Sequence, residues 1–247
     1  MQKSTSLDEW FETPLGQYLL EQEQAYFDRA VADLFGFNAL QLGLCQYDLL
    51  RANRMPFRCS AGGGGPVKLM TDLQHLPIAS QSIDLLVLPH VLEFSANPHQ
   101  ILREVERVLM PEGRIIVSGF NPWSLWGARR LLESGDAGYP WCGKFINLPR
   151  LKDWLALLGF EMAAGSLCCY APPFRGEKWL SRFHFMEPAG DRWWAMAGGV
   201  YFLHAIKRVH GMRLITPRWN EAVAANRALA PAQKVVNFRK TKDETSG

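Results

Sequence analysis

Residues 71–120 read TDLQHLPIASQSIDLLVLPHVLEFSANPHQILREVERVLMPEGRIIVSGF, and this stretch decides the fold. Within it, Ile83–Leu88 is a nearly continuous apolar run, which is typical of a parallel strand buried on both faces. Pro98–Met110 places its apolar side chains on one helical face, with Asn97 as a candidate N-cap, and Arg114–Ser118 is a further strand. A strand, a helix and a strand in this order predict a parallel sheet with helices packed against it.

The same alternation extends to both sides of this stretch. Toward the N-terminus we expect a helix at Pro14–Gly36 with Thr13 as its N-cap, a strand at Ala39–Leu42, a helix at Tyr47–Asn53, and strands at Met55–Ser60 and Val67–Met70. Toward the C-terminus we expect a helix at Leu148–Leu158 and strands at Phe160–Leu167 and Val200–Lys207. The pattern predicts an α/β fold with a doubly wound, mostly parallel sheet of about seven strands and helices on both faces.

We expect one main domain at 37–212, with a helical addition at 1–36, a substrate-side insertion at 139–192 and a polar basic tail at 213–247. The 48% hydrophobic and 21% charged content excludes a disordered, collagen-like or coiled-coil chain. The five cysteines show no C-x-x-C pair or zinc spacing, and Met1–Glu9 does not resemble a secretory signal. We therefore expect a cytoplasmic protein without a metal site.

Charge and hydropathy limit the classes of partner. The net charge is +3, and much of the excess lies in Lys234–Lys242, so duplex DNA is not expected as the main partner. That segment is either a solvated tail or a weak contact for RNA or acidic lipid. A group of aromatic residues has two interpretations: it belongs to the core, or it forms an apolar lid or membrane-surface patch. The group is Trp193–Trp194 with Trp179, Phe183 and Phe185 nearby. The longest apolar stretch, Trp193–Ile206, is too short for a transmembrane segment.

Four blocks carry a family resemblance: 71–77, 82–87, 90–93 and 102–114. In order and spacing they resemble the class I S-adenosylmethionine-dependent methyltransferases, type 11 branch, whose patterns are D-x-x-x-L-P-F, S-F-D-x-V, L-E-H and L-R-E-x-x-R-V-L-x-P-G-G. The resemblance implies S-adenosylmethionine as cofactor and methyl transfer to an unidentified small-molecule or lipid-like acceptor. Holding the acceptor in line with an activated methyl group supplies most of the rate in such a reaction, so no nucleophilic triad is expected.

The resemblance also implies a cofactor site. It places eight residues of this chain there: Gln41, Gly43, Leu44, Cys45, Ser60, Asp72, Leu73 and Pro89. The chain departs from the family pattern at two points. Only Gly43 remains of the glycine motif, preceded by Gln41 where the family has an acid, and Ser60 replaces the acid that takes both ribose hydroxyls. Loss of a charged bidentate contact costs about 1–3 kcal/mol, which weakens binding by one to two orders of magnitude.

Four residues have two interpretations each. Asp72 either accepts a hydrogen bond from the adenine amine or caps the turn before Leu76. His90 lies at the end of the Ile83–Leu88 strand, where it is either a general base for the acceptor or a structural hydrogen-bonding residue. Asn121 and Trp123 either line the substrate pocket, as an orienting amide and a stacking indole, or belong to an ordinary Asn-Pro turn.

A second function stays open beside methyl transfer. The eroded glycine motif and the missing ribose acid are also expected of a non-catalytic descendant of the same fold, which binds a partner or another ligand. Saturable binding of the cofactor distinguishes the two functions.

Overall fold

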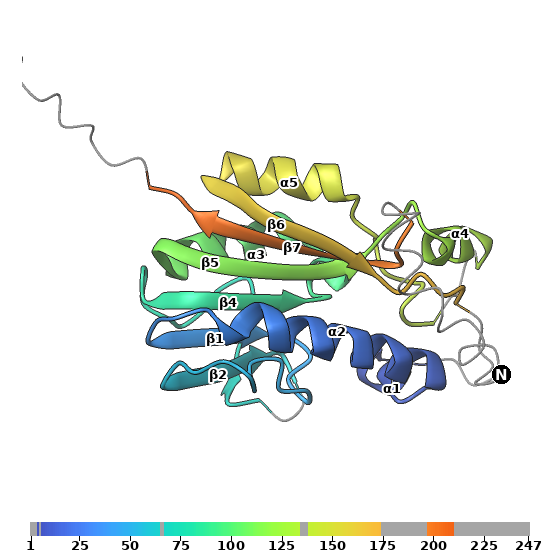
Figure 1. Ribbon diagram of the computed structural model, residues 1–247, viewed down its shortest axis with the longest axis horizontal. Helices are drawn as coiled ribbons and strands as arrows, with labels where there is room; N and C mark the ends of the chain where they lie inside the picture. The colour runs from blue at the N-terminus through green and yellow to red at the C-terminus, as the bar shows by residue number, and fades with distance from the viewer. Residues whose placement is uncertain (1–3, 5, 65–66, 134–137, 174–196, 210–247) are drawn as a thin grey trace, which may run out of the picture. The chain divides into compact units, whose positions relative to one another are not determined.

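The computed structural model describes residues 4, 6–64, 67–133, 138–173 and 197–209. Its centre is a seven-stranded sheet in the order β3-β2-β1-β4-β5-β7-β6 (Figure 1). The strands are β1 Asn38–Leu42, β2 Phe57–Gly62, β3 Leu69–Met70, β4 Ile83–Pro89, β5 Leu109–Phe120, β6 Phe160–Cys168 and β7 Val200–Lys207. All neighbouring strands are parallel except β7, which is antiparallel to β5 and β6. The predicted seven-stranded, mostly parallel sheet is confirmed.

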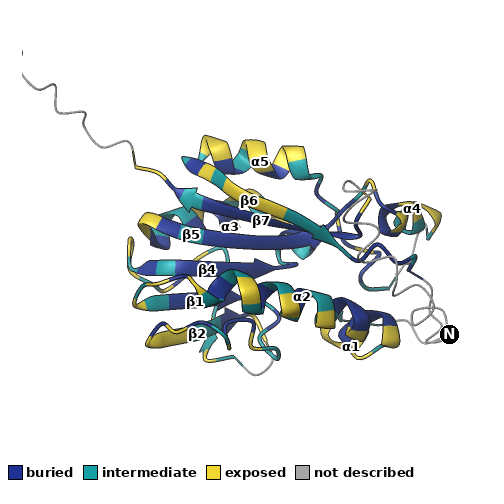
Figure 2. Ribbon diagram, viewed as in Figure 1, coloured by how far each residue is buried: buried dark blue, intermediate teal, exposed yellow. Residues whose placement is uncertain are grey.

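Helices cover both faces of this sheet. They are α1 Leu7–Phe11, α2 Pro14–Ala32, the 3₁₀ turn η1 Leu92–Phe94, α3 Pro98–Val108, α4 Leu125–Leu132 and α5 Leu148–Leu157. Strand β4 shows the two-sided burial directly, because Leu85 and Val87 belong to one apolar core and Leu86 and Leu88 to the other. The first core contains residues of α1, α2 and α4, and the second contains residues of α3 and α5. Figure 2 shows the central strands as a continuous buried layer.

Several boundaries differ from the sequence prediction. The helix predicted at Pro14–Gly36 is α2, which ends at Ala32, four residues before Gly36. A separate short helix, α1, precedes it and was not predicted. Thr13 is the N-cap of α2, as predicted, and its hydroxyl accepts a hydrogen bond from the Gly16 N–H. Asn97 makes no side-chain cap on α3; its amide instead donates to Gln74 Oε1, 3.1 Å away.

The helix predicted at Tyr47–Asn53 is wrong: these residues form successive turns. Side chains satisfy the backbone donors that a helix would need. Gln41 Oε1 accepts from the Leu49 N–H at 3.1 Å, and Asp48 Oδ1 accepts from the Leu50 N–H at 3.0 Å. Such local side-chain hydrogen bonds compete with helix formation, and here they hold the segment in a turn.

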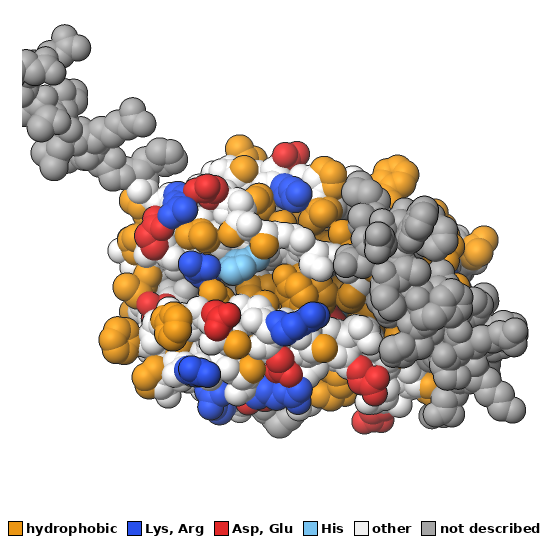
Figure 3. Space-filling view, viewed as in Figure 1, with side chains coloured by type: hydrophobic (Ala, Val, Ile, Leu, Met, Phe, Trp, Pro, Cys, Tyr) orange, Lys and Arg blue, Asp and Glu red, His pale blue; other side chains and the backbone are white. Residues whose placement is uncertain are grey.

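Parts of the chain lie outside the described residues. They include the whole of the predicted tail at 213–247, with its basic segment Lys234–Lys242, and the aromatic residues Trp179 to Trp194. Among the described helices, none has the length and apolar character needed to cross a membrane. Lysine and arginine side chains are interspersed with acidic ones over the described part of the face in Figure 3, which offers no continuous basic area for a duplex.

A buried charged cluster attaches α2 to the sheet. Glu23 on α2 and Glu93 in η1 approach the imidazole of His90 from its two sides, with Nε2 2.8 Å from Glu23 Oε1 and Nδ1 3.3 Å from Glu93 Oε2. The second Glu93 oxygen accepts a hydrogen bond from the Phe120 N–H at the end of β5. All three charged side chains are at most 1% exposed. The cluster therefore joins three elements that are distant in sequence.

The two carboxylates decide the charge of His90. Burial alone would lower the pKa of this imidazole, but the charges of Glu23 and Glu93 and their hydrogen bonds raise it to about 10. The folded protein then binds a proton that the unfolded chain releases near pH 6.5. The stability that this proton contributes is present below pH 6.5 and is lost as the pH rises toward 10.

We predict that the free energy of unfolding falls between pH 6.5 and pH 10 by up to about 1.4 kcal/mol per pH unit from this group. His90→Gln should remove that slope and be less stable than the wild type at pH 6. His75→Gln is the control, because the His75 side chain is 76% exposed. Urea titrations at half-unit pH steps measure all three proteins. Parallel pH profiles for the wild type and His90→Gln would contradict the assignment.

Candidate functional site

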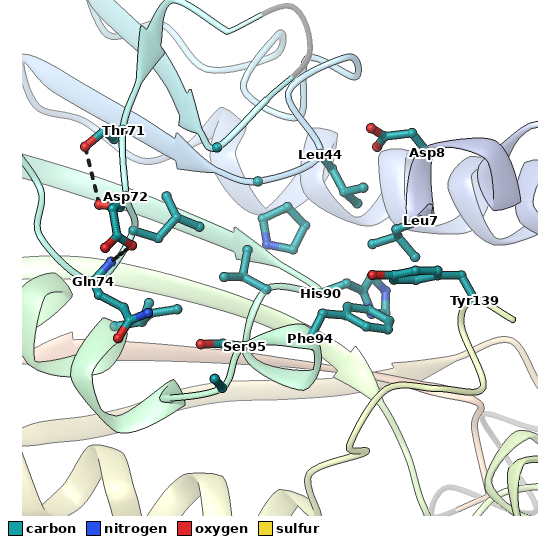
Figure 4. Close-up of a pocket in the computed structure, with 17 residues that line it drawn as sticks. Leu7, Asp8, Leu44, Thr71, Asp72, Gln74, His90, Phe94, Ser95 and Tyr139 are labelled. Carbon is teal, nitrogen blue, oxygen red and sulfur yellow. Dashed lines mark hydrogen bonds between the residues drawn. The ribbon is translucent and has the colours of Figure 1, made fainter. Parts of the chain in front are cut away.

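A cavity of about 450 Å³, here called the central cavity, opens at the carboxyl ends of β1 and β4 (Figure 4). Its lining comes from α1, the loop after β1, the residues after β2 and β3, and the segment after β4. Two carboxylates, those of Asp8 and Asp72, belong to this lining, and no described lysine or arginine does. Figure 4 shows the two acids on opposite sides of the cavity. The cavity therefore suits a ligand that carries positive charge.

Gly43 forms the floor of the central cavity where β1 ends. Its φ angle is +81°, a conformation that L-residues rarely adopt. A Cβ atom at this position would lie 2.5 Å from Cγ2 of Val91, on the neighbouring segment after β4. The turn is therefore closed too tightly for a side chain at Gly43, and Gly43 and Leu44 both line the cavity. The resemblance predicts a close approach of the cofactor to this glycine.

Asp72 lies at the other end of the cavity, together with Leu73. Its Oδ1 accepts a hydrogen bond from the Gln74 N–H at 2.9 Å, and its Oδ2 is 3.3 Å from His75 Nδ1. The Gln74 hydrogen bond lowers the pKa of this carboxyl, and His75 lowers it further. Asp72 thus caps its turn and also borders the cavity, so the structure accommodates both of the roles that the sequence left open.

Gln41 organises the loop after β1 and does not line the central cavity. Its Nε2 lies within hydrogen-bonding distance of three carbonyl oxygens: 3.1 Å from Gly43, 3.1 Å from Leu44 and 2.8 Å from Tyr47. Its Oε1 accepts from Leu49, as described above. The side chain is buried, and its donors and acceptor are used within the loop. A neutral amide suits this task because the same group must both donate and accept.

Ser60 and Cys45 face a different space from the one expected. They line a small cavity of about 200 Å³ beside Gln41, not the central cavity. Burial raises the pKa of the Cys45 thiol, which keeps it protonated at neutral pH. Ser60 lies away from the central cavity because β2 continues two residues past it, to Gly62. The residue after this strand that borders the central cavity is Gly63, and a Cβ there would meet nothing within 4 Å.

The three predicted substrate residues separate in the structure. His90 forms part of the cavity wall, but its side chain is fully buried and both ring nitrogens face carboxylates. Asn121 is also buried; its Nδ2 donates to the Gly198 carbonyl at 3.0 Å and its Oδ1 accepts from the Trp123 N–H at 3.0 Å. Trp123 is 78% exposed and lines a further cavity of about 460 Å³, here called the aromatic cavity.

Sequence reasoning missed residues that the N-terminal helices and the late loops bring to the central cavity. Leu7 and Asp8 enter it from α1, Phe94 from η1, and Tyr139 from the loop before α5. The ring centroids of Phe94 and Tyr139 are 5.0 Å apart. Ser6, followed three residues later by Glu9, was a usable signal for α1, because this is the spacing of a capping motif. No local pattern indicates that α1 would reach the cavity. Among the described residues, no group of His, Cys, Asp or Glu could hold a metal ion.

Known proteins match this arrangement in sequence and in fold. Residues 44–117 match the family described as Methyltransferase domain, of the type 11 branch. The chain is 32% identical to the uncharacterized protein YafS of Escherichia coli (strain K12) over 161 residues, which cover 64% of this chain and 67% of that protein. It is 30% identical to a malonyl-[acyl-carrier protein] O-methyltransferase of Methylovorus sp. over 90 residues, which cover 36% of this chain and only 30% of that enzyme.

A solved structure repeats the fold. The structure is an S-adenosylmethionine-dependent methyltransferase of Thermotoga maritima, described as a possible histamine N-methyltransferase. The TM-score is 0.55 at 14% identity, and the alignment covers 78% of this chain and 97% of that one. The chain belongs to the class I S-adenosylmethionine-dependent methyltransferases, in the type 11 branch.

Proposed function

We propose that this protein binds S-adenosylmethionine in the central cavity and transfers its methyl group to a small-molecule or lipid-like acceptor. The observation that carries the proposal is the cavity itself, which lies at the carboxyl ends of β1 and β4 and is bordered by Gly43, Asp72 and Pro89. Ligands of open parallel sheets bind at this edge, and about 450 Å³ is within the range of roughly 300–1,000 Å³ for small-molecule sites.

The described lining fits this cofactor with fewer charged contacts than the family pattern has. The backbone at Gly43 and Leu44 would receive the methionine part, and Asp72 with Leu73 the adenine. Asp8, on α1, would supply the counter-charge for the ammonium group that Gln41 cannot supply. When bound, S-adenosylmethionine supplies a methyl group on a sulfonium, whose sulfur keeps the bonding electrons as the acceptor's lone pair takes the methyl. The chain's own residues contribute orientation and proximity.

Of the two roles open for His90, the contacts favour the structural one. A general base needs a ring nitrogen that reaches the acceptor, whereas both nitrogens of His90 lie near buried carboxylates. We propose that His90 holds the wall beside the methyl position and that proton release from the acceptor goes to solvent. The cytoplasmic location predicted from the cysteine content stays a prediction; none of the five cysteines forms a disulfide.

Non-catalytic ligand binding is the alternative, and one observation favours it. The loop after β1 has no helix, and its Gln41 side chain is occupied within the loop. A ligand there finds neither the acid nor the helix N-terminus that the family motif supplies. Under this alternative, S-adenosylhomocysteine would not saturate the protein.

Calorimetric titration with S-adenosylhomocysteine tests the proposal, and we expect a dissociation constant below about 1 mM, or a binding free energy beyond roughly −4 kcal/mol. Gly43→Val should abolish this binding, because its side chain collides with Val91 and distorts the floor of the cavity. Gly159→Val is the matched control: Gly159 also has a φ angle of +82°, but it does not line the cavity. Absence of binding to the wild type at millimolar ligand rejects the cofactor and supports the alternative.

Asp72→Ala separates the two roles of that carboxylate. If Asp72 accepts from the adenine amine, the affinity for S-adenosylhomocysteine should fall about 5- to 150-fold. If Asp72 only caps its turn at Gln74, the melting temperature should fall instead. Both quantities are measured on the same preparation. Unaltered affinity in a destabilised variant removes Asp72 from the cofactor site.

Gly63→Asp should restore the missing ribose contact. The position borders the central cavity directly after β2, and nothing lies within 4 Å of a Cβ there. A carboxylate that accepts from both ribose hydroxyls should tighten S-adenosylhomocysteine binding by about 10-fold. Gly64→Asp is the control, since this neighbour is equally open but does not line the cavity. Equal affinities in the two variants would show that the ribose does not lie at the end of β2.

A further inference from the structure

The aromatic cavity has a charge opposite to that of the central cavity. Its described lining includes Lys144, Arg150 and His99 and contains no carboxylate. Two other cations of this chain are paired with acids: Arg51 Nη2 is 2.5 Å from Asp28 Oδ2, and Arg107 Nη2 is 2.9 Å from Glu104 Oε2. No carboxylate among the described residues forms a salt bridge with Lys144 or Arg150. Two cationic side chains therefore line one cavity, and no described carboxylate lines it with them.

Flat apolar surfaces complete this cavity. Trp123, Phe145 and Trp154 line it, and Trp123 is 78% exposed. The Arg150 guanidinium carbon lies 5.2 Å from the ring centroid of Trp154, which orients this cation against an aromatic wall. The backbone N–H of Trp123 donates a hydrogen bond to Asn121 Oδ1. The loop that carries the indole is therefore held by a buried residue. A planar ligand can stack on the exposed indole of Trp123 and contact the edge of Trp154, while an anionic group meets the cations.

The aromatic cavity adjoins the central cavity. Ser95 and Ala96, between η1 and α3, line both of them. Ser95 is labelled at the edge of the central cavity in Figure 4. A molecule in the aromatic cavity is therefore separated from the central cavity by the wall of one short segment. If the central cavity holds the methyl donor, an acceptor held in the aromatic cavity lies beside it, and its reacting atom must reach past Ser95 and Ala96 to come in line with the methyl group.

We propose that the aromatic cavity binds the methyl acceptor, and that this acceptor carries a carboxylate or phosphate group joined to a flat apolar part. Lys144 and Arg150 bind the anionic group, and Trp123 and Trp154 contact the flat part. That the ligand is the acceptor rests on the proposed function. The preference of the cavity for a planar anion rests only on its own residues.

Calorimetry with three probes tests the proposal on the full-length protein. Naphthalene-2-carboxylate and 1-naphthyl phosphate carry the two candidate anions, and naphthalene-2-carboxamide is the neutral control. At least one anion should bind about 3- to 10-fold more tightly than the amide. The tighter of the two acids identifies the anionic group. Equal binding of the acids and the amide, or no saturable binding of either acid, would overturn the proposal.

Four variants locate the binding. Lys144→Gln and Arg150→Gln should each weaken the preferred acid about 3- to 10-fold and leave the amide unchanged. Trp123→Ala should weaken the acid and the amide alike, because it removes the stacking surface. Lys152→Gln is the matched control, since Lys152 is exposed on the same helix and does not line the cavity. An acid affinity that does not respond to Lys144→Gln and Arg150→Gln overturns the site.

Titrations of the same protein with the acids and with S-adenosylhomocysteine distinguish this inference from the proposed function. If the acids bind as expected and S-adenosylhomocysteine does not, the anion site stands and methyl transfer fails. If S-adenosylhomocysteine binds and the acids do not, the cofactor site stands and this inference fails. If saturating S-adenosylhomocysteine leaves the acid able to bind, the two ligands occupy separate cavities, as the proposal requires. Competition between them would place both in one cavity and overturn it.

Discussion

The charged cluster around His90 is the interaction on which the arrangement of this site depends. His90 has a φ angle of +49°, a conformation that costs a side-chain-bearing residue about 1–2 kcal/mol and persists only where its surroundings hold it. Glu23 and Glu93 hold it from two sides. Removing one partner from a buried ion pair leaves a charge without compensation, at a cost of about 3–5 kcal/mol. Helix α2 is therefore fixed to the sheet, and the helix before it is kept at the cavity.

The segment after β1 and the N-terminal helix α1 both contribute to the central cavity. In place of a helix after β1 there are turns, and Gln41 holds those turns with a neutral amide. The nearest carboxylate to this end of the cavity that belongs to its lining is that of Asp8 on α1. The glycine motif is reduced to Gly43, and helix α1 brings a carboxylate to the same cavity.

Two adjoining cavities of opposite charge lie at the carboxyl edge of the sheet. Asp8 and Asp72 border one of them, while Lys144 and Arg150 border the other. Electrostatic complementarity discriminates between ligands more than it adds affinity, because a like charge is rejected at each place. A cationic donor and an anionic acceptor would therefore be sorted by charge before any specific contact is made. Exposure of these side chains to water makes this sorting dependent on ionic strength.

The sequence by itself determined the seven strands, their order along the chain and the family, because these follow from local hydrophobic periodicity and from contiguous motifs such as residues 102–114. It also indicated the tight turn after Leu42, where Gly43 has a φ angle of +81° that depends on this residue alone. The sequence did not predict the carboxylates that contact His90. Glu23 lies 67 residues away along the chain and reaches His90 only when α2 packs on the sheet. The same limit applies to Ser60, because the true length of β2 is decided by its pairing with β1 and β3. Cavities are formed by side chains from separate elements, so their charges were decided by the tertiary structure alone.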